Sequence, residues 1–451
     1  MGPKLKGPQT GELFRQPLVE LINGNHPLAK LAELIDWGVF EREWAPLFPS
    51  GRGRPATSPR MVAGLLYLQH TFACSDEALI WTWVENPYWQ RFCGETYFQH
   101  EPPIDPSSLS RWRKRIGEAG VEWLLTQTIE AARKAKVIKA ASLEKVIVDT
   151  TVMEKAVAYP TDSRLLERGR QHLVKLADRL GIQLRQNYNR QAPRLAGQVG
   201  RYAHAKQYKR MRATLKKLRT LVGRVWRDID RQRTSLAPEQ AAKVESILVR
   251  VQRLLEQKPK DKNKLYSLHA PEVECIAKGK ARQPYEFGVK VTVATTHQEG
   301  LVVGMRSLPG NPFDGHTLAE ALEQVEILTE QKPKAVFVDK GYQGAEVQGV
   351  KVWRSGLRRG ITRRLKQDIK RRSAIEPMIG HMKNEGLLRR NWLRGSLGDA
   401  LHAVLCGAGH NLRMILRKLL LLRAQILALL EIFSAFPATS KNQPALLGIA
   451  A

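Results

Sequence analysis

Cysteine is scarce in this sequence, and the few cysteines present are poorly placed for cross-linking. Cys74, Cys93, Cys275 and Cys406 lie far apart, and none forms a CxxC pair. This spacing argues against a disulfide framework and against a zinc ribbon. A reducing compartment, the cytoplasm, is therefore the expected location.

Long apolar runs are also missing. Residues 1–16 are polar and contain Gly and Pro, without an apolar signal core. The most apolar stretch, residues 412–436, is interrupted by charged side chains. We expect it to form an amphipathic helix packed on protein rather than a membrane span. The sequence therefore predicts no membrane partner.

Acidic residues are outnumbered by basic ones. The chain has 73 Lys and Arg against 43 Asp and Glu, a formal net charge of +30. Such a charge attracts polyanions, and nucleic acid is the usual large polyanion. A ribosome-associated protein and a peripheral membrane protein are the alternatives. A DNA-bound form would associate with the nucleoid.

The basic excess is concentrated in one stretch. Arg164 to Arg233 contains 20 Lys and Arg against 4 Asp and Glu, a net charge of +16. Like charges at helical neighbour spacing repel each other unless a polyanion neutralises them. We therefore predict that this stretch binds the DNA backbone, with Lys206, Lys209 and Arg210 among its contacts.

Residues 1–140 are predicted to form a helical N-terminal domain. Apolar residues recur at helical spacing on both sides of a Gly-, Pro- and Arg-rich loop at 49–59. A helix start is predicted at 106–110, where one of the serines is expected to cap the helix. Arg111 and Arg113 follow directly and are predicted DNA contacts of a helix-turn-helix-like domain. A helical bundle with a solvated basic face is the alternative.

Residues 141–410 differ from the N-terminal part in sequence pattern, because β-branched runs typical of buried strands appear. The predicted strands are 145–151, 285–296, 301–305 and 335–339, with a helix at 317–331 before the last of them. Once residues 152–284 are removed, this is the element order of the RNase H fold. We therefore predict an α/β chain with an RNase H-like mixed-sheet catalytic domain. A helical basic insertion, 152–284, interrupts this domain, and a C-terminal helix and tail, 411–451, follow it.

Two acids are predicted to end hydrophobic strands of this domain. Asp149 and Asp339 each follow a β-branched run, and neighbouring parallel strands present their carboxyl ends together. Two carboxylates at close range repel each other, and Mg²⁺ or Mn²⁺ relieves that repulsion. Phosphoryl transfer in DNA favours two such ions about 3.5–4 Å apart, which requires a third carboxylate.

Glu376 is the predicted third carboxylate. Arg372 precedes it by four residues and Lys383 follows it by seven, offsets that place all three side chains on one helix face. Pro377 indicates that the helix begins near Glu376, so Arg372 is expected just before it. An exposed basic face with one salt-bridged Glu is the alternative interpretation.

These motifs resemble those of bacterial insertion-sequence transposases of the DDE class, in particular insertion sequence family five. The matching motifs are Val-Ile-Val-Asp149-Thr-Thr, Val-Asp339-Lys-Gly-Tyr-Gln-Gly344 and Arg372-x3-Glu376-x6-Lys383. Asn311-Pro-Phe-Asp-Gly-His316 and the stretch from Gly53 to Tyr88 are also similar. The chain departs from the family at Ile369, where relatives often carry Tyr.

The resemblance implies a transposase that binds the ends of an insertion sequence and catalyses metal-dependent strand cleavage and strand transfer. Asp149, Asp339 and Glu376 would hold two Mg²⁺ or Mn²⁺ ions. The predicted DNA contacts near them are Arg372, Lys383, Lys340 and Tyr342. The expected partners are the terminal inverted repeats, the target DNA and a second copy of the chain in the active complex.

Two other functions are alternatives to this one. A structure-specific nuclease would cut DNA without joining it, and a non-catalytic DNA-binding protein would do neither. The intact set of acids argues against the second, and the N-terminal domain and basic insertion argue against the first. Asp314 and His316 precede a predicted helix, where they could contact DNA or support the site, although a loop or capping role is the more common one for Asp314. Trp392, Trp353 and Trp226 are either base-stacking residues or, more commonly, core.

Overall fold

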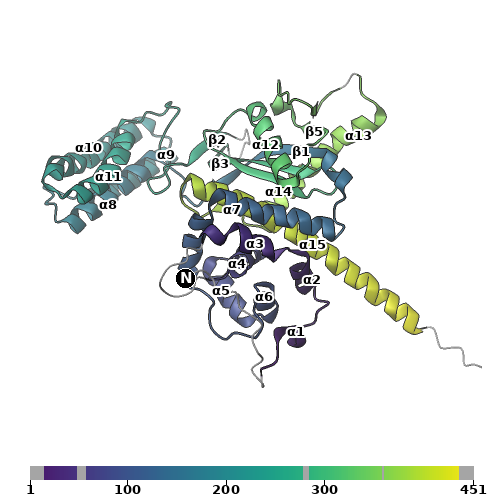
Figure 1. Cartoon of the computed structure of the whole chain (residues 1–451). Coiled ribbons are helices and arrows are strands. Elements are labelled where there is room, and N and C mark those ends of the chain that lie inside the picture. Colours follow the sequence, from purple (N-terminus) through teal and green to yellow (C-terminus); the bar gives the residue numbers. More distant parts are fainter. Residues whose placement is uncertain (1–14, 48–56, 278–283, 358–359, 436–451) are drawn as a thin grey trace, which may run out of the picture. The chain divides into compact units, whose positions relative to one another are not determined.

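The computed structural model describes residues 15–47, 57–277, 284–357 and 360–435 (Figure 1). Most of the predicted loop at 49–59, including Gly53, lies outside the described residues. The chain divides into two compact units, which are described separately. The first contains residues 1–112, 126–140 and 408–451, and the second contains residues 113–125 and 141–407.

The first unit is helical. Its short helices are α1 (Leu18–Leu21), α2 (Pro27–Leu34), α3 (Trp37–Glu43), α4 (Pro59–Phe72), α5 (Asp76–Glu85) and α6 (Pro87–Phe92). Serine caps begin two of them, because Ser58 accepts from the backbone N–H of Met61 and Ser75 from that of Ala78. The core is built on large side chains that are fully buried, among them Phe40, Tyr67 and Trp83.

Two long helices contribute residues to both units. α7 (Pro106–Lys134) begins where the sequence predicts, but Asp105 rather than a serine caps it by accepting from the N–H of Ser107. α15 (Gly395–Ala435) begins well before the predicted apolar helix. Within the described ranges, every helix is too short or too polar to span a bilayer.

The second unit contains a mixed sheet. Its strands are β1 (Lys145–Lys155), β2 (Glu274–Ala277), β3 (Tyr285–Thr296), β4 (Val302–Leu308), β5 (Ala335–Val338), β6 (Lys351–Arg354) and β7 (Arg390–Asn391). The strand order is β2-β3-β1-β5-β6, with β4 also paired to β3 and β7 to β1. β1 pairs with β3 in antiparallel and with β5 in parallel. The sheet and its helices confirm the predicted α/β class.

β1 is longer than predicted, and Asp149 lies within it rather than at its end. The strand continues to Lys155 because β3 pairs with it as far as Glu154, opposite Gly288. A Cβ atom at Gly288 would clash with the Met153 carbonyl, so this close approach requires glycine. On the other side, β5 pairs with β1 only as far as Ile147.

This pairing leaves a notch in the sheet. β7 resumes the pairing at Glu154, so among the described residues no strand flanks β1 on that side from 148 to 153. Asp149 lies at the β5 end of the notch. The side chains in this stretch are therefore approached from helices and loops rather than from a neighbouring strand.

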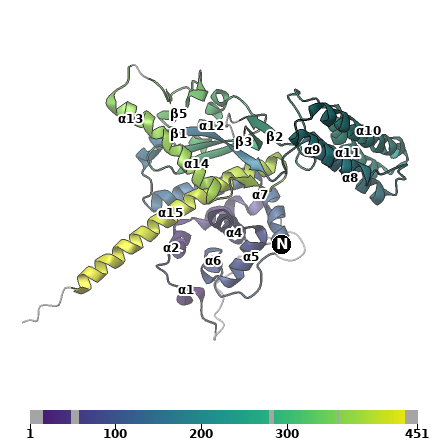
Figure 2. The same ribbon diagram turned by 180° about the vertical axis from the view of Figure 1, so that it is seen from behind.

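Helices cover both faces of the sheet (Figures 1 and 2). α14 (Ile375–Asn384) packs through Ile375 on Ile147 and Phe337. α12 (Asp314–Thr329) packs on the other face, where Val325 lies against Gly304 of β4. Side chains alternate between faces along a strand, so Asp149 points to the α14 face with Ile147.

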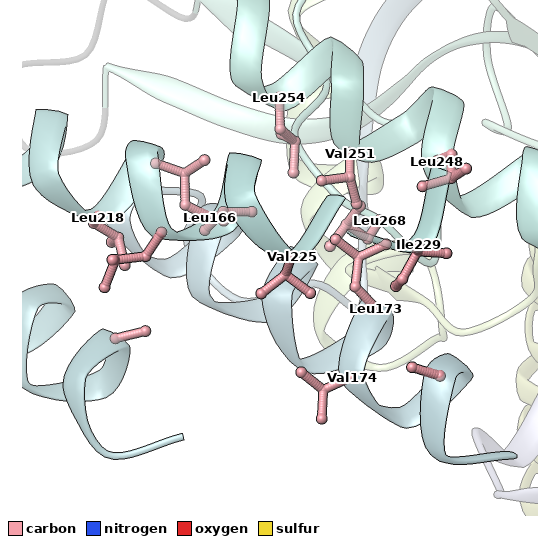
Figure 3. Packing of buried hydrophobic residues seen from close by; sticks show 14 of the residues in the cluster. Leu166, Leu173, Val174, Leu218, Val225, Ile229, Leu248, Val251, Leu254 and Leu268 are labelled. Carbon is pink, nitrogen blue, oxygen red and sulfur yellow. The ribbon is translucent and has the colours of Figure 1, made fainter. Parts of the chain in front are cut away.

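Four helices stand between β1 and β2, within the predicted insertion. They are α8 (Asp162–Leu180), α9 (Gln191–His204), α10 (Tyr208–Gln232) and α11 (Pro238–Glu256). These helices enclose a hydrophobic core of their own, in which Leu173, Val225 and Val251 meet (Figure 3). A core inside the insertion means that the bundle does not depend on the sheet to bury its apolar side chains.

A buried ionic cluster joins the insertion to the sheet. Lys155 Nζ lies 2.9 Å from Glu272 Oε1 and 2.6 Å from Asp399 Oδ1, and the Lys155 side chain is only 5% exposed. Asn391 Nδ2 donates to the same Asp399 oxygen at 2.6 Å. Because these residues come from β1, from the chain leaving the bundle, from β7 and from α15, the cluster fixes four segments together.

We expect Lys155→Met to lower the free energy of unfolding by about 3–5 kcal/mol, because the buried Asp399 and the partly buried Glu272 would lose their counter-charge. Urea unfolding followed by circular dichroism measures this loss. Lys258→Met, at an exposed lysine, is the control and should change stability little. A loss below about 1 kcal/mol for Lys155→Met would mean that the cluster contributes no more than a surface ion pair.

Candidate active site

The structure brings Asp149 and Asp339 side by side. β1 and β5 are parallel, with Val146 opposite Val336 and Ile147 opposite Phe337. The same register carried two residues further sets Asp149 beside Asp339, which directly follows β5. Neighbouring strands lie about 4.8 Å apart, so the two carboxylates share one end of the notch.

Arg372 brings Glu376 to the same place. Its guanidinium donates to Asp149 Oδ2 at 3.0 Å and to Glu376 Oε1 at 2.8 Å. Arg372 lies in a 3-10 turn between α13 (Arg363–Arg371) and α14, so the helix that carries Glu376 begins where the sequence predicts. The Arg372 side chain is 12% exposed, so it is not a member of an exposed basic face.

The negative charge of Asp149 is costly in this environment. Burial raises the pKa of the Asp149 carboxyl, and the nearby Asp339 raises it further. The Thr150 N–H and the Arg372 guanidinium act in the opposite direction without cancelling the shift. A divalent cation would relieve this cost by stabilising the ionised form.

Asp314 is a fourth carboxylate at this place, and its contacts favour support of the site over a capping role among the alternatives that the sequence leaves open. Its carboxylate makes no capping bond on α12. Instead Oδ1 accepts from Thr150 Oγ1 at 3.1 Å and from Lys290 Nζ at 3.1 Å. Lys290 also donates to the Pro312 carbonyl at 2.7 Å, which ties the segment before α12 to the sheet.

Tyr342 lies beneath these acids. Its side chain has 0% exposure, and its hydroxyl has no hydrogen-bond partner among the described residues. Burial raises the pKa of the Tyr342 hydroxyl, and Asp149, Asp314 and Asp339 raise it further. Clustered carboxylate oxygens and an unpartnered hydroxyl fit a hard divalent ion such as Mg²⁺ or Mn²⁺, which prefers oxygen ligands.

The predicted DNA contacts differ in how exposed their side chains are. Those on the surface are Arg111, Lys206, Lys209, Arg210 and Lys340, while Lys383 is half-buried. Arg113 is 4% exposed and Tyr342 is fully buried, so neither side chain offers a surface to DNA. For these two residues the structure does not support the predicted contact.

Lys383 lines a basic pocket at the β7 end of the notch. The pocket has a volume of about 530 Å³, and its other lining residues include Arg389, Arg390 and Trp392. Trp392 is 58% exposed. By contrast, Trp226 donates to the Leu248 carbonyl within the bundle, and Trp353 packs on the α14 face of the sheet.

Comparisons with known proteins agree with the geometry. Residues 16–115 match the family model described as a transposase domain (DUF772), and residues 227–406 match a transposase DDE domain. The chain is 47% identical over 208 residues to an uncharacterized protein, ORF8 in the nfe locus of Rhizobium meliloti. That alignment covers 46% of this chain and 100% of the other protein. No solved structure matches the chain.

Three of the four acids lie within the range that matches the DDE domain. Asp314, Asp339 and Glu376 lie inside the DDE match, whereas Asp149 and most of the helical bundle precede it. The assignment of Asp149 to the site therefore depends on the strand register and on its bond to Arg372. Both place it with the acids inside the match.

Proposed function

Since this chain belongs to the DDE transposase family, we propose that it binds the ends of an insertion sequence and catalyses metal-dependent strand cleavage and strand transfer. The observation that carries the proposal is the meeting of Asp149 and Glu376 on Arg372, with Asp339 beside Asp149. We also propose that the element belongs to insertion sequence family five, and that the sheet with α12 and α14 is an RNase H-like catalytic domain. With residues 152–284 left out, the run β1, β3, β4, α12 and β5 has the strand-strand-strand-helix-strand order that supports that fold, and β6 follows before α13 and α14.

Asp149, Asp339 and Glu376 would hold the divalent ions. Bound ions of this kind activate the attacking hydroxyl or water and stabilise the leaving oxygen of the phosphodiester. The protein's own contribution is positional. Arg372 holds the Asp149 and Glu376 carboxylates in place through one hydrogen bond to each.

The helical bundle supplies a surface suited to the DNA backbone. Lys206, Lys209 and Arg210 are exposed, and Arg194, Lys217 and Arg224 line a groove of about 480 Å³ between α9 and α10. Backbone phosphates are bound by such side chains without sequence preference. Recognition of the element ends would then fall to the N-terminal helices, with Arg111 among the contacts.

Linear DNA that carries the native element ends tests the proposal. Incubation with the full chain and Mg²⁺ should yield both nicked and joined products, because a transposase transfers the 3′-hydroxyl that it releases. Nicked products alone would identify a structure-specific nuclease, and neither product would identify a non-catalytic DNA-binding protein. An element has two ends, so we also propose that two copies of the chain act together. Light scattering of the DNA complex measures that number.

We expect Arg372→Ala to weaken capture of the element end and joining by about 10- to 100-fold, because a charge-assisted phosphate contact contributes about 1.5–3 kcal/mol. Arg372→Lys should not restore joining, since a lysine lacks the planar guanidinium that bonds Asp149 and Glu376 at the same time. Because Arg372 also lowers the pKa of Asp149, its removal should move the acid limb of the activity profile to higher pH.

Lys383→Ala is the matched comparison for Arg372→Ala. It should weaken end binding by a similar factor but leave the acid limb unmoved, because Lys383 is not among the groups that shift the pKa of Asp149. Gel shifts and strand-transfer assays across a pH series separate the two effects. Wild-type end binding and joining by both alanine variants would overturn the phosphate contact.

A further inference from the structure

Asp314 is a further carboxylate at the notch, beside the three acids of the proposed metal centre. Asp314 enters from α12, on the opposite face of the sheet from α14, and still reaches the end of β5. Thr150 and Lys290 hold its Oδ1. Oδ2 has no hydrogen-bond partner among the described residues and faces the turn that follows Asp339.

Gly341 shows how close Asp314 and Asp339 are. A Cβ atom built on Gly341 would lie 3.0 Å from Asp339 Oδ1 and 3.4 Å from Asp314 Oδ2. Both oxygens therefore border the same small space, and this space stays open because Gly341 has no side chain. Lys290 offsets part of the Asp314 charge and the Gly341 N–H donates to Asp339 Oδ1, and a divalent cation would offset the remaining repulsion between the two carboxylates.

Tyr342 is an independent sign of a ligand at this place. A buried hydroxyl without a partner is costly, so native proteins rarely keep one without a reason. This hydroxyl lies within the electrostatic influence of Asp149, Asp314 and Asp339 together. From this position the Tyr342 hydroxyl can donate a hydrogen bond to a carboxylate or to a water molecule that is bound to a metal ion.

We propose that Asp314 is a fourth carboxylate ligand of the metal centre and that the Tyr342 hydroxyl donates a hydrogen bond within the loaded centre. The inference rests on the proposed function, because it assigns further residues to the same ions. Gly341 keeps the space between Asp314 and Asp339 free for an ion.

The competing interpretation is structural. In it, Asp314 only ties the segment before α12 to Thr150 and Lys290, and Tyr342 only fills the core. Under that interpretation Asp314→Asn lowers the melting temperature of the metal-free protein and leaves metal affinity unchanged. The two interpretations therefore differ in metal binding, which can be measured without any DNA or turnover.

The test is a titration of the full chain with Mn²⁺, in which electron paramagnetic resonance reports the free ion. We expect Asp314→Asn to weaken Mn²⁺ binding by at least about tenfold. Gly341→Ala should do the same with every carboxylate retained, because its methyl group occupies the shared space. Glu320→Gln, at an exposed carboxylate on the same helix, should bind Mn²⁺ like the wild type.

Tyr342→Phe should weaken Mn²⁺ binding several-fold, yet leave the melting temperature of the metal-free protein unchanged or higher, because an unpartnered hydroxyl has been removed. Unchanged Mn²⁺ affinity in both Asp314→Asn and Gly341→Ala overturns the inference. If Asp314→Asn does not fold, Gly341→Ala decides alone. Asp149→Asn shows whether only the role of Asp314 has failed or the whole metal centre. If Asp149→Asn also binds Mn²⁺ like the wild type, the proposed metal centre itself is wrong.

Discussion

Asp149→Asn is expected to abolish strand cleavage and joining while DNA binding continues. A carboxamide has the shape of the carboxylate but not its charge, so it cannot hold a divalent ion. Asp339→Asn and Glu376→Gln should behave alike, because the three side chains act as one set. The expected loss of activity is roughly three orders of magnitude or more, the scale found when a member of a catalytic set is removed.

The fold offers a check on Asp149→Asn. The pKa of Asp149 is raised in the folded protein, which means that its ionised form is disfavoured there and weakens stability at pH values above that pKa. Asparagine carries no such charge, so the melting temperature at pH 7 without metal should not fall. Glu326→Gln, at an exposed site on α12, is the activity control. Full cleavage by any of the three variants would remove that residue from the site.

Removing positive charge from the basic bundle is expected to have the second large effect, which is a loss of DNA affinity. Lys206, Lys209, Arg210, Lys216 and Lys217 are all exposed on or before α10. Each phosphate that the protein no longer neutralises lowers the slope of log affinity against log salt by about 0.9 on duplex DNA. Glutamine at all five positions should therefore flatten the slope by up to about 4.5 and weaken binding most at low salt.

A matched control uses lysines of the same insertion outside the basic stretch. Lys258, Lys260 and Lys262 are exposed in the segment after α11, and their triple glutamine variant can be compared with that of Lys209, Lys216 and Lys217. Fluorescence anisotropy over a salt series gives both slopes. An unchanged slope in the five-residue variant would mean that α10 faces solvent or another subunit instead.

The strands and helices around the site follow closely from sequence pattern. β3 spans the predicted 285–296, β5 lies within the predicted 335–339, and α12 covers most of the predicted 317–331. Their signals are local, because β-branched runs and helical spacing are visible in a short window. The length of β1 is not visible in this way, since its second half is set by pairing with β3, more than 130 residues away.

Asp314 and Tyr342 show where sequence reasoning stops. An Asp just before a helix is most often a cap, and nothing near Asp314 shows that Thr150, 164 residues earlier, will hold its carboxylate. A Tyr in a short motif beside a catalytic acid gives no sign of whether it faces DNA or the core. Tyr342 is buried because the turn after β5 folds it beneath the acids, which only the tertiary structure reveals.

The helical bundle enters and leaves the sheet through one narrow neck. Tyr159 and Tyr266, at its two ends, both lie against Phe287 of β3, and Lys155 and Glu272 form an ion pair beside them. With its core complete and its ends adjacent, the bundle has the properties of an exchangeable cassette. Helices in it can lengthen, shorten or change charge during evolution without moving the acids of β1 and β5. If the bundle binds DNA as proposed, related proteins could in this way differ in how they bind DNA while they retain the same set of acids.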